Sequence, residues 1–367
     1  MSNRTAYVDF KTLSNFMIDV FVGVGVPRED AEICADVLIT SDLWGIESHG
    51  IQRLKMYYDR IKEGKQLPVT KINIIKDGHT TALIDGGNGM GQLIAYRSMQ
   101  IAIEKAKKYG TGAVSVRNSN HFGIAGYYVM MAAKEGMVGM AITNARATVA
   151  PTFGVEPLLG TNPLTFGCPT DEPFPFIIDC ATSITQRGKI EVLNRADKPT
   201  PEGLVIGSNG ETLTDTKNIL KGINAGTAAL LPLGGMGETL GGHKGYGYST
   251  LVEILSAALG GGPYLRGLSA GDKDKKTPYR LGHFFLAVNV SNFTPLDEFK
   301  KTAGNILREL RSSKKAPGHT RIYTAGEKEY EKQKERIKTG IPIIPSIQKD
   351  ILIMKKELGL DQYQFRF

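Results

Sequence analysis

Hydrophobic residues recur with helical spacing at both ends of the chain. Near the N-terminus, apolar residues at i, i+3, i+4, i+7 and i+8 predict an amphipathic helix with one buried face: Leu13, Phe16, Met17, Val20 and Phe21. Pro27 and the acidic residues after it predict the start of a second helix. Further helices are predicted over residues 296–311 and up to Leu358, where Ser346 is the expected N-cap. The chain is therefore expected to begin and end in helices.

Short apolar runs bounded by glycine or polar residues predict strands in the middle of the chain: residues 80–85, 112–116, 137–143, 176–182 and 283–290. Between these runs, helices are predicted over residues 92–107, 124–136 and 248–259. This is the pattern of an α/β protein. A length of 367 residues allows two domains, or one large domain with an appended lobe.

Composition indicates a folded, soluble protein. Hydrophobic residues make up 41% of the chain and charged residues 22%. The formal charge of +8 suggests a nucleic-acid surface, but lysine and glutamate are interleaved over residues 328–338 as on a solvated helix face. No apolar run reaches the length of a membrane span, and the N-terminus lacks a signal-peptide core. We therefore expect neither a nucleic-acid nor a membrane partner.

The number and spacing of the cysteines bear on metal binding and on the cellular compartment. Cys34, Cys168 and Cys180 are an odd number of scattered thiols without the paired spacing of metal ligands. They predict no metal site, and a reducing, cytoplasmic compartment.

His121 follows an apolar strand and lies among small polar residues, within Asn118-Ser119-Asn120-His121-Phe122-Gly123. Catalytic and binding groups collect at such strand ends. A neutral imidazole there can take a proton from a hydroxyl near neutral pH, because its ordinary pKa is about 6.5. On this pattern alone, a structural histidine is an equal alternative.

A second polar cluster lies near the N-terminus. Ser48 and His49 stand between two glycines, and Arg53 follows where a helix is expected to begin. A guanidinium held on a helix can grip a carboxylate bidentately. The alternative is a capping serine with a surface arginine.

Two glycine-rich loops resemble nucleotide-binding motifs only superficially. The glycines of residues 86–91 follow a strand and precede a helix, but they do not fall as G-x-G-x-x-G. In residues 241–247, His243 separates Gly242 from Lys244 and Gly245 follows, which departs from the P-loop pattern. Lys244 near a helix N-terminus remains a candidate for binding an anion.

Five blocks, taken in order, resemble one family, the malate/L-lactate/ureidoglycolate dehydrogenases, also called type-2 malate dehydrogenases. The blocks are Ser48-His49-Gly50 with Arg53, residues 118–123, Gly160-Thr161-Asn162-Pro163, Lys244-Gly245-Tyr246-Gly247, and Pro317-Gly318 with Gly326-Glu327. They extend over nearly the whole chain. The resemblance implies an NAD(P)-dependent oxidoreductase of 2-hydroxy acids that forms a homodimer.

The implied fold is α/β, with a non-Rossmann cofactor-binding domain built on a large mixed or antiparallel sheet. Residues 76–294 would form this domain. Residues 1–75 and 295–367 would form a mainly helical lobe for substrate binding and dimerisation.

The resemblance also implies roles for individual residues. His121 would be the catalytic acid and base, with Asp179 orienting it or binding the cofactor. Arg53 would clamp the substrate carboxylate, and the other implied substrate residues are Ser48, His49, Tyr57, Thr161 and Asn162. The implied cofactor residues are Asn144, Ala145, Asp179, Cys180, Ala181, Lys244, Gly326, Glu327 and Lys328, with the main chain binding at Ala145 and Cys180.

Malate and NAD are the expected substrate and cofactor, taken from the family. L-lactate, ureidoglycolate, sulfolactate and cyclic imino acids remain open as substrates. NADP also remains open, because Arg187, Lys189 and Arg195 lie where a 2′-phosphate would find a basic partner.

Overall fold

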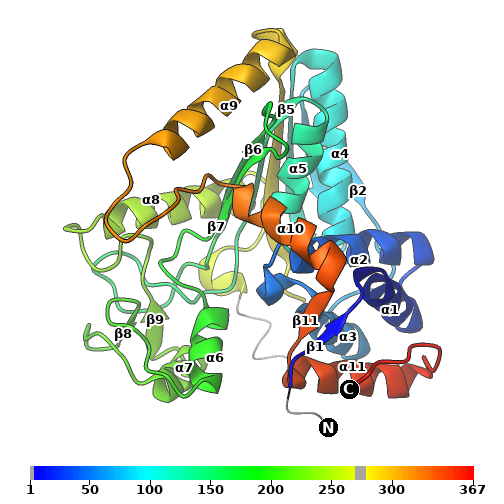
Figure 1. Cartoon of the computed structure of the whole chain (residues 1–367), viewed down its shortest axis with the longest axis vertical. Helices are drawn as coiled ribbons and strands as arrows, with labels where there is room; N and C mark the ends of the chain where they lie inside the picture. The colour runs from blue at the N-terminus through cyan, green and yellow to red at the C-terminus, as the bar shows by residue number, and fades with distance from the viewer. Residues whose placement is uncertain (1–3, 269–277) are drawn as a thin grey trace.

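A seven-stranded mixed sheet forms the centre of the molecule (Figure 1). The computed structural model describes residues 4–268 and 278–367. The strand order is β2-β3-β4-β10-β5-β6-β7. The strands are β2 (Asn73–Asp77), β3 (Thr81–Asp85), β4 (Thr111–Ser119), β5 (Met137–Thr143), β6 (Leu164–Cys168), β7 (Phe176–Cys180) and β10 (Leu281–Asn289).

Only one neighbouring pair in this sheet is parallel. Strands β3 and β4 run side by side in the same direction, with α4 (Gly91–Tyr109) as their connection, and the other pairs are antiparallel. A dinucleotide-binding Rossmann sheet is built from repeated parallel units, which this sheet lacks. The expected α/β fold with a large mixed sheet is confirmed.

Helices cover both faces of the sheet. Helices α4 and α5 (Gly126–Lys134) pack on one face, and α8 (Gly242–Glu253) with the π-helical turn η3 (Ile254–Ala258) packs on the other. Because side chains alternate along a strand, Phe285 of β10 enters the main core while Gly282 faces η3. A Cβ at Gly282 would lie 1.9 Å from the Ser256 carbonyl oxygen, so this close approach requires glycine.

The N- and C-terminal segments pack together beside the sheet. This lobe contains α1 (Phe10–Gly23), α2 (Arg28–Leu43), α3 (Leu54–Lys62), α10 (Glu327–Thr339), α11 (Pro345–Leu358), and the antiparallel pair of β1 (Ala6–Val8) with β11 (Ile341–Ile343). The five predicted stripe residues of α1 are all buried. The N-cap prediction for the last helix is wrong: α11 begins at Pro345 and Ile344 is the N-cap residue, because proline is suited to the first helical position. The Gln348 side chain of α11 donates to the Arg4 carbonyl oxygen at 2.8 Å, which joins the two terminal segments.

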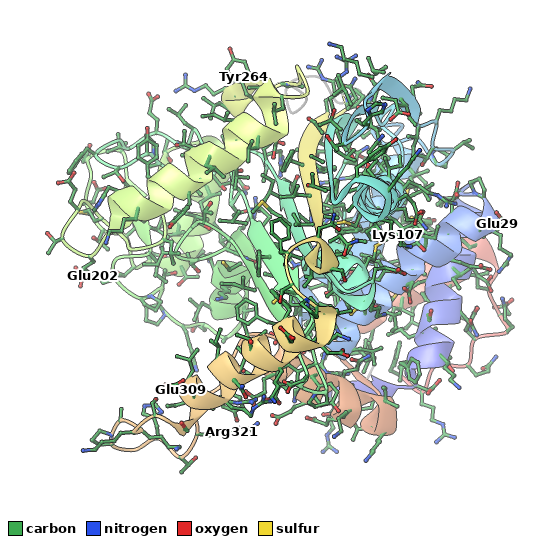
Figure 2. The ribbon with its side chains drawn as sticks, turned by 90° about the horizontal axis from the view of Figure 1, so that it is seen from above. Glu29, Lys107, Glu202, Tyr264, Glu309 and Arg321 are labelled. Atoms are coloured by element: carbon green, nitrogen blue, oxygen red, sulfur yellow. The ribbon has the colours of Figure 1, made fainter. Side chains whose placement is uncertain are left out.

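A smaller lobe has its own core. It contains α6 (Arg187–Arg195), β8 (Val205–Gly207), α7 (Thr216–Ala225) and β9 (Ala228–Leu230). The apolar residues at its centre are Val149, Leu159, Ile190, Val205, Ile219, Ile223, Ala228 and Leu230. Viewed from above, Glu202 of this lobe lies on the opposite side of the molecule from Glu29 of α2 (Figure 2).

Hydrophobic packing does not follow the boundaries expected at residues 75 and 295. The main core is continuous from α1 through the sheet to α11, whereas the separate core lies within residues 149–230. Helix α9 (Leu296–Ser312) reaches the helical lobe at its C-terminal end, where Arg311 lies 3.6 Å from Glu327 of α10. Among the described helices, none combines the length and apolar character that crossing a bilayer requires.

Candidate active site

A pocket of about 540 Å³ lies where the helical lobe, the sheet and the small lobe meet. The segment from Ile46 to Arg60 forms one side, the ends of β4, β5 and β7 contribute the floor, and the start of α6 forms the other side. Eight of the residues predicted for the site line it: Ser48, His49, Arg53, His121, Ala145, Thr161, Asp179 and Ala181. Residues from five separate parts of the sequence therefore share one cavity.

The glycine loop before α4 supports the segment that carries His121. The Asn120 side-chain amide donates to the carbonyl oxygens of Asn88 and Gly89, both at 2.9 Å. A Cβ at Gly91 would lie 2.4 Å from the main-chain oxygens of both Asn120 and His121. The glycines of residues 86–91 thus allow backbone to approach backbone behind the site. This gives the loop a structural role in place of the rejected dinucleotide fingerprint.

His121 lies just beyond the end of β4, as predicted, and its half-buried ring lies between two other site residues. Its Nδ1 atom is 2.5 Å from the Tyr57 hydroxyl oxygen. Its ring stacks on His49 with centroids 5.4 Å apart and planes 21° from parallel. Burial, reinforced by His49 and by the Arg53 charge, lowers the pKa of His121 well below its ordinary value. The imidazole is therefore neutral at pH 7 and able to accept a proton.

Ser48, His49 and Arg53 hold one another on two short 3₁₀ turns, η1 (Glu47–His49) and η2 (Ile51–Arg53). The Ser48 hydroxyl is 2.8 Å from His49 Nδ1, and Arg53 Nε donates to the Ser48 carbonyl oxygen at 2.6 Å. Burial and the Arg53 charge lower the pKa of His49 to about 4. Since Nε is occupied, the terminal NH groups of Arg53 are the ones that can bind a carboxylate.

The sequence predicts a helix that begins near Gly50, with Arg53 one turn inside it, but α3 begins at Leu54, so Arg53 is its N-cap residue. Four residues with helical spacing, Arg53, Met56, Tyr57 and Arg60, then point toward the site: three line the pocket, and Tyr57 bonds to His121. One helix face thus carries two guanidinium groups and the partner of the histidine.

Asp179 lines the pocket, but its carboxylate is held by other groups. One oxygen accepts from the Gly126 N–H at 2.7 Å and the other from the Thr165 hydroxyl at 3.0 Å. The family resemblance implied that Asp179 orients His121 or binds the cofactor. In the structure it bonds to the first N–H of α5, a helix that precedes it in the chain, and the Nδ1 partner of His121 is Tyr57. Burial raises the pKa of Asp179.

Asn144 and Asn162 lie behind the pocket wall, where they fix the loop that carries Ala145. The Asn162 side-chain oxygen accepts from Ala145 N–H at 3.0 Å, and its amide donates to Glu253 at 2.9 Å. Asn144 also donates to Glu253, at 3.3 Å, and accepts from Gly282 N–H at 2.9 Å. Both asparagines are fully buried, so they position the lining rather than form it.

Comparison with known proteins identifies the architecture. The family model described as malate/L-lactate dehydrogenase matches residues 8–352. The chain belongs to the malate/L-lactate dehydrogenase family. It is 45% identical over 348 residues to malate dehydrogenase of Pyrococcus abyssi, covering 95% of this chain and 94% of that one. It is 38% identical over 345 residues to L-sulfolactate dehydrogenase of Methanocaldococcus jannaschii, covering 94% and 95%.

Structural comparison agrees with this assignment. The crystal structure of malate dehydrogenase from Entamoeba histolytica superimposes with a TM-score of 0.95 at 44% identity, covering 99% of this chain and 100% of that one. The resemblance seen in the sequence motifs is thereby confirmed. As a dehydrogenase of this family, the protein uses a nicotinamide cofactor.

The other residues implied for cofactor binding in this dehydrogenase lie outside the pocket lining. Lys244 is exposed in the first turn of α8, which begins at Gly242 and not at Tyr248 as expected. Cys180 is exposed at the end of β7, next to Asp179. Gly326, Glu327 and Lys328 lie at the start of α10. Their roles stay predictions.

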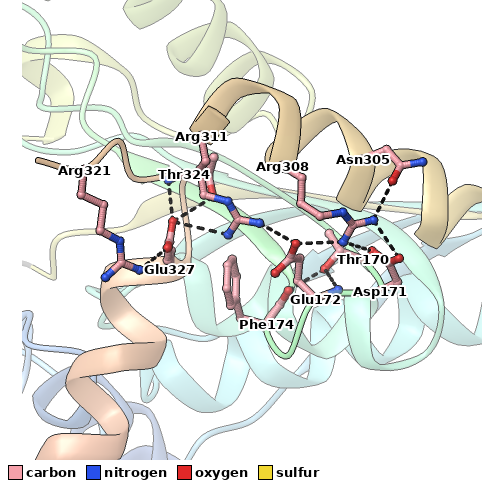
Figure 3. A network of polar contacts seen from close by, with 10 residues as sticks. All are labelled: Thr170, Asp171, Glu172, Phe174, Asn305, Arg308, Arg311, Arg321, Thr324 and Glu327. Atoms are coloured by element: carbon pink, nitrogen blue, oxygen red, sulfur yellow. Dashed lines mark hydrogen bonds and ion pairs between the residues drawn. The ribbon is translucent and has the colours of Figure 1, made fainter. Parts of the chain in front are cut away.

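Glu327 also belongs to a network of charged residues that joins α9 to α10 (Figure 3). Its carboxylate accepts from the N–H and hydroxyl of Thr324 at 3.0 and 3.2 Å, which ties the loop before α10 to the first residue of that helix. Arg321 also pairs with it, and Arg311 lies 3.6 Å away. Although burial acts to raise the pKa of Glu327, these donors hold it below its ordinary value. The carboxylate therefore has a structural role.

The pocket lining also includes two arginines and a tyrosine that the sequence analysis did not predict as site residues: Arg60, Arg146 and Tyr279. Arg60 had a detectable signal, because it lies seven positions after Arg53 and so on the same helix face. Tyr279 had none, since only folding brings the residues before β10 to α3.

Proposed function

We propose that this protein is an NAD-dependent malate dehydrogenase, which interconverts malate and oxaloacetate. The supporting observation is a neutral, half-buried His121 that shares its pocket with Arg53. Enzymes named malate dehydrogenase, related over 94% of their own length, support the choice of malate.

In the oxidation direction, the terminal NH groups of Arg53 bind the C1 carboxylate and the substrate hydroxyl faces His121. The Nε2 atom of His121 takes the hydroxyl proton, which requires the tautomer with its hydrogen on Nδ1, where the Tyr57 oxygen, 2.5 Å away, can accept it. The nicotinamide, when bound, accepts the hydride from the same carbon. In the reverse direction the imidazolium returns the proton to the carbonyl oxygen.

The pocket also offers places for the cofactor that fit a nicotinamide. The main chain at Ala145 and Ala181 and the side chain of Asp179 line the cavity with His121, where amide groups would meet a carboxamide. Exposed Lys244, at the N-terminal end of α8, is suited to a phosphate because both the lysine and the helix dipole attract anions. Lys244→Ala is therefore expected to weaken NADH binding, measured by NADH fluorescence.

The preference for NAD or NADP is tested by comparing kcat/KM with NADH and with NADPH. Arg187 pairs with Glu191 at 2.9 Å and bonds to Asn224, so this arginine is already engaged. This supports NAD, and we expect a higher kcat/KM with NADH than with NADPH.

The substrate is tested by NADH oxidation with oxaloacetate, pyruvate and a cyclic imino acid. Turnover of oxaloacetate supports the proposal, and its absence refutes malate as the substrate.

The mechanism is tested with His121→Ala, which is expected to lower kcat by at least ~100-fold while NADH still binds, because a general base contributes roughly 10²–10⁴-fold. Arg53→Lys is expected mainly to raise KM, since lysine cannot reproduce the forked contact.

We further propose a homodimer in a reducing, cytoplasmic compartment. Exposed apolar side chains along α8 and η3 support a subunit contact: Tyr248, Leu251 and Ile254. Light scattering with size-exclusion chromatography measures the assembly directly, and a monomer at micromolar concentration would contradict it.

A further inference from the structure

Two guanidinium groups lie over one aromatic ring at the edge of the active-site pocket. The Arg60 guanidinium carbon is 4.4 Å from the centroid of the Tyr279 ring, and that of Arg146 is 5.3 Å from it. All three side chains line the pocket that contains His121 and Arg53. The cation–π contacts fix the directions of both arginines, although the two positive charges repel each other.

Arg60 is half-buried, and nothing in the described structure neutralises it. Within residues 4–268 and 278–367, neither Arg60 nor Arg53 forms an ion pair with a carboxylate. The two acidic residues of the pocket lining are engaged elsewhere: Asp179 with Gly126 and Thr165, and Glu191 with Arg187. Burial, together with repulsion from Arg146 and Arg53, lowers the pKa of Arg60. The pocket therefore has more positive charge than a single carboxylate can balance.

The spacing of the arginines shows how this charge is arranged. Arg53 and Arg60 are seven residues apart on one helix face, which places their Cα atoms roughly 10 Å apart along α3, with Tyr57 between them holding His121. Long side chains from both ends can therefore reach a small molecule whose reacting carbon faces the histidine. Its two ends would meet different arginines.

We propose that Arg60, held flat by Tyr279, binds a second anionic group of the substrate while Arg53 binds the first. This assignment rests on the proposed 2-hydroxy-acid dehydrogenase function and narrows it to dianionic substrates. The second group is a carboxylate or a sulfonate, either of which matches the planar fork of a guanidinium. A substrate that ends in a methyl group leaves Arg60 desolvated and without a partner, which disfavours it.

The test compares kcat/KM for oxaloacetate and pyruvate in the wild-type enzyme and in Arg60→Gln, with NADH as the reductant. The wild type is expected to favour oxaloacetate by at least ~100-fold, because a site built for a polar group strongly rejects an analogue that lacks it. In Arg60→Gln, kcat/KM for oxaloacetate is expected to fall by roughly 100-fold, whereas that for pyruvate stays the same or rises. Arg97→Gln, on the exposed face of α4, is the matched control and should leave both values unchanged.

Further variants separate the contributions and guard against misfolding. Tyr279→Phe keeps the ring and should keep the preference, whereas Tyr279→Ala should reduce it. Arg60→Lys keeps the charge but loses the fork, so it should fall between the wild type and Arg60→Gln. Far-UV circular dichroism and the melting temperature report whether each variant is folded.

The outcomes distinguish this inference from the proposed function. If the wild type reduces neither acid, the dehydrogenase proposal itself fails. If it reduces both, but prefers pyruvate or keeps the same preference in a folded Arg60→Gln variant, only the assignment of Arg60 fails. Comparing 3-sulfopyruvate with oxaloacetate identifies the second group: the substrate with the larger kcat/KM carries the anion that Arg60 binds.

Discussion

Replacing Tyr57 with phenylalanine tests how His121 is prepared for proton transfer. The change removes one oxygen atom, 2.5 Å from His121 Nδ1, and leaves the ring that packs in the main core. To act as a base through Nε2, the neutral imidazole must carry its proton on Nδ1, and Tyr57 is positioned to accept that hydrogen bond. Without this oxygen, the required tautomer loses its partner.

The cost follows from burial. The Tyr57 side chain is buried and the His121 ring is half-buried, and a buried polar group left without a partner costs ~1–3 kcal/mol. If this cost falls entirely on the reactive tautomer and on the imidazolium, kcat is lowered by roughly 5- to 150-fold. The same loss lowers the pKa of His121 still further, because the charged form is disfavoured. Reduction of the oxo acid, which needs the charged form, should therefore suffer more as pH rises.

Steady-state rates in both directions over pH 5.5–9, with NADH affinity measured separately, provide the assay. Tyr58→Phe is the matched control, because its hydroxyl bonds to Glu357 on the other side of α3. This control should keep the wild-type kcat. Tyr57→Phe should lower kcat while NADH affinity changes little. If a folded Tyr57→Phe enzyme keeps both the wild-type kcat and the wild-type pH profile, the role given to Tyr57 is refuted.

Three further predictions concern buried ionisable groups. Burial lowers the pKa of His283 from 6.5 to about 3, so the free energy of unfolding should fall by up to ~5 kcal/mol as pH drops from 6.5 to 3. In unfolding experiments at several pH values, His283→Gln should reduce this dependence on pH. Burial raises the pKa of Asp42 from 3.8 to about 8, so the wild-type protein should lose stability as pH rises from 4 to 8. In Asp42→Asn, the drop in melting temperature between pH 5 and pH 8 should be smaller than in the wild type. An equal drop in both proteins would contradict this. Glu253 accepts hydrogen bonds from three donors, so Glu253→Gln should lower the free energy of unfolding by ~1–3 kcal/mol in denaturant titrations and raise KM for the cofactor. Wild-type values for both would show that Glu253 does not hold the pocket loop.

Local patterns predicted the elements well where one physical effect dominated. The apolar stripe from Leu13 to Phe21 and the strand over residues 137–143 are found where they were expected, because each has a periodicity that burial alone explains. Errors arose where backbone geometry decides: α8 begins six residues early, since glycines that discourage helix in isolation are needed for its close contact with the preceding loop. A Cβ at Gly242 would lie 2.0 Å from the Gly235 oxygen.

The site was predictable in its chemistry and not in its contacts. Motif resemblance placed Arg53 and His121 together, and they share the pocket. It could not show that Tyr57, rather than Asp179, bonds to the histidine, because that depends on how α3 packs against the end of β4. The separate core of the small lobe was likewise hidden, since its members are scattered over residues 149–230 with no continuous pattern.

Burial explains both the neutral base and the cationic wall of this pocket. It removes the positive charge from His121, but it cannot remove the charge of an arginine, whose pKa lies far above neutral pH. The pocket thus holds a base beside guanidinium groups that hold its pKa down. A dianionic substrate bound between Arg53 and Arg60 would reverse that effect, because two negative charges near His121 favour its protonated form. The charge pattern that selects the substrate would in this way also supply the proton that reduction of an oxo acid consumes.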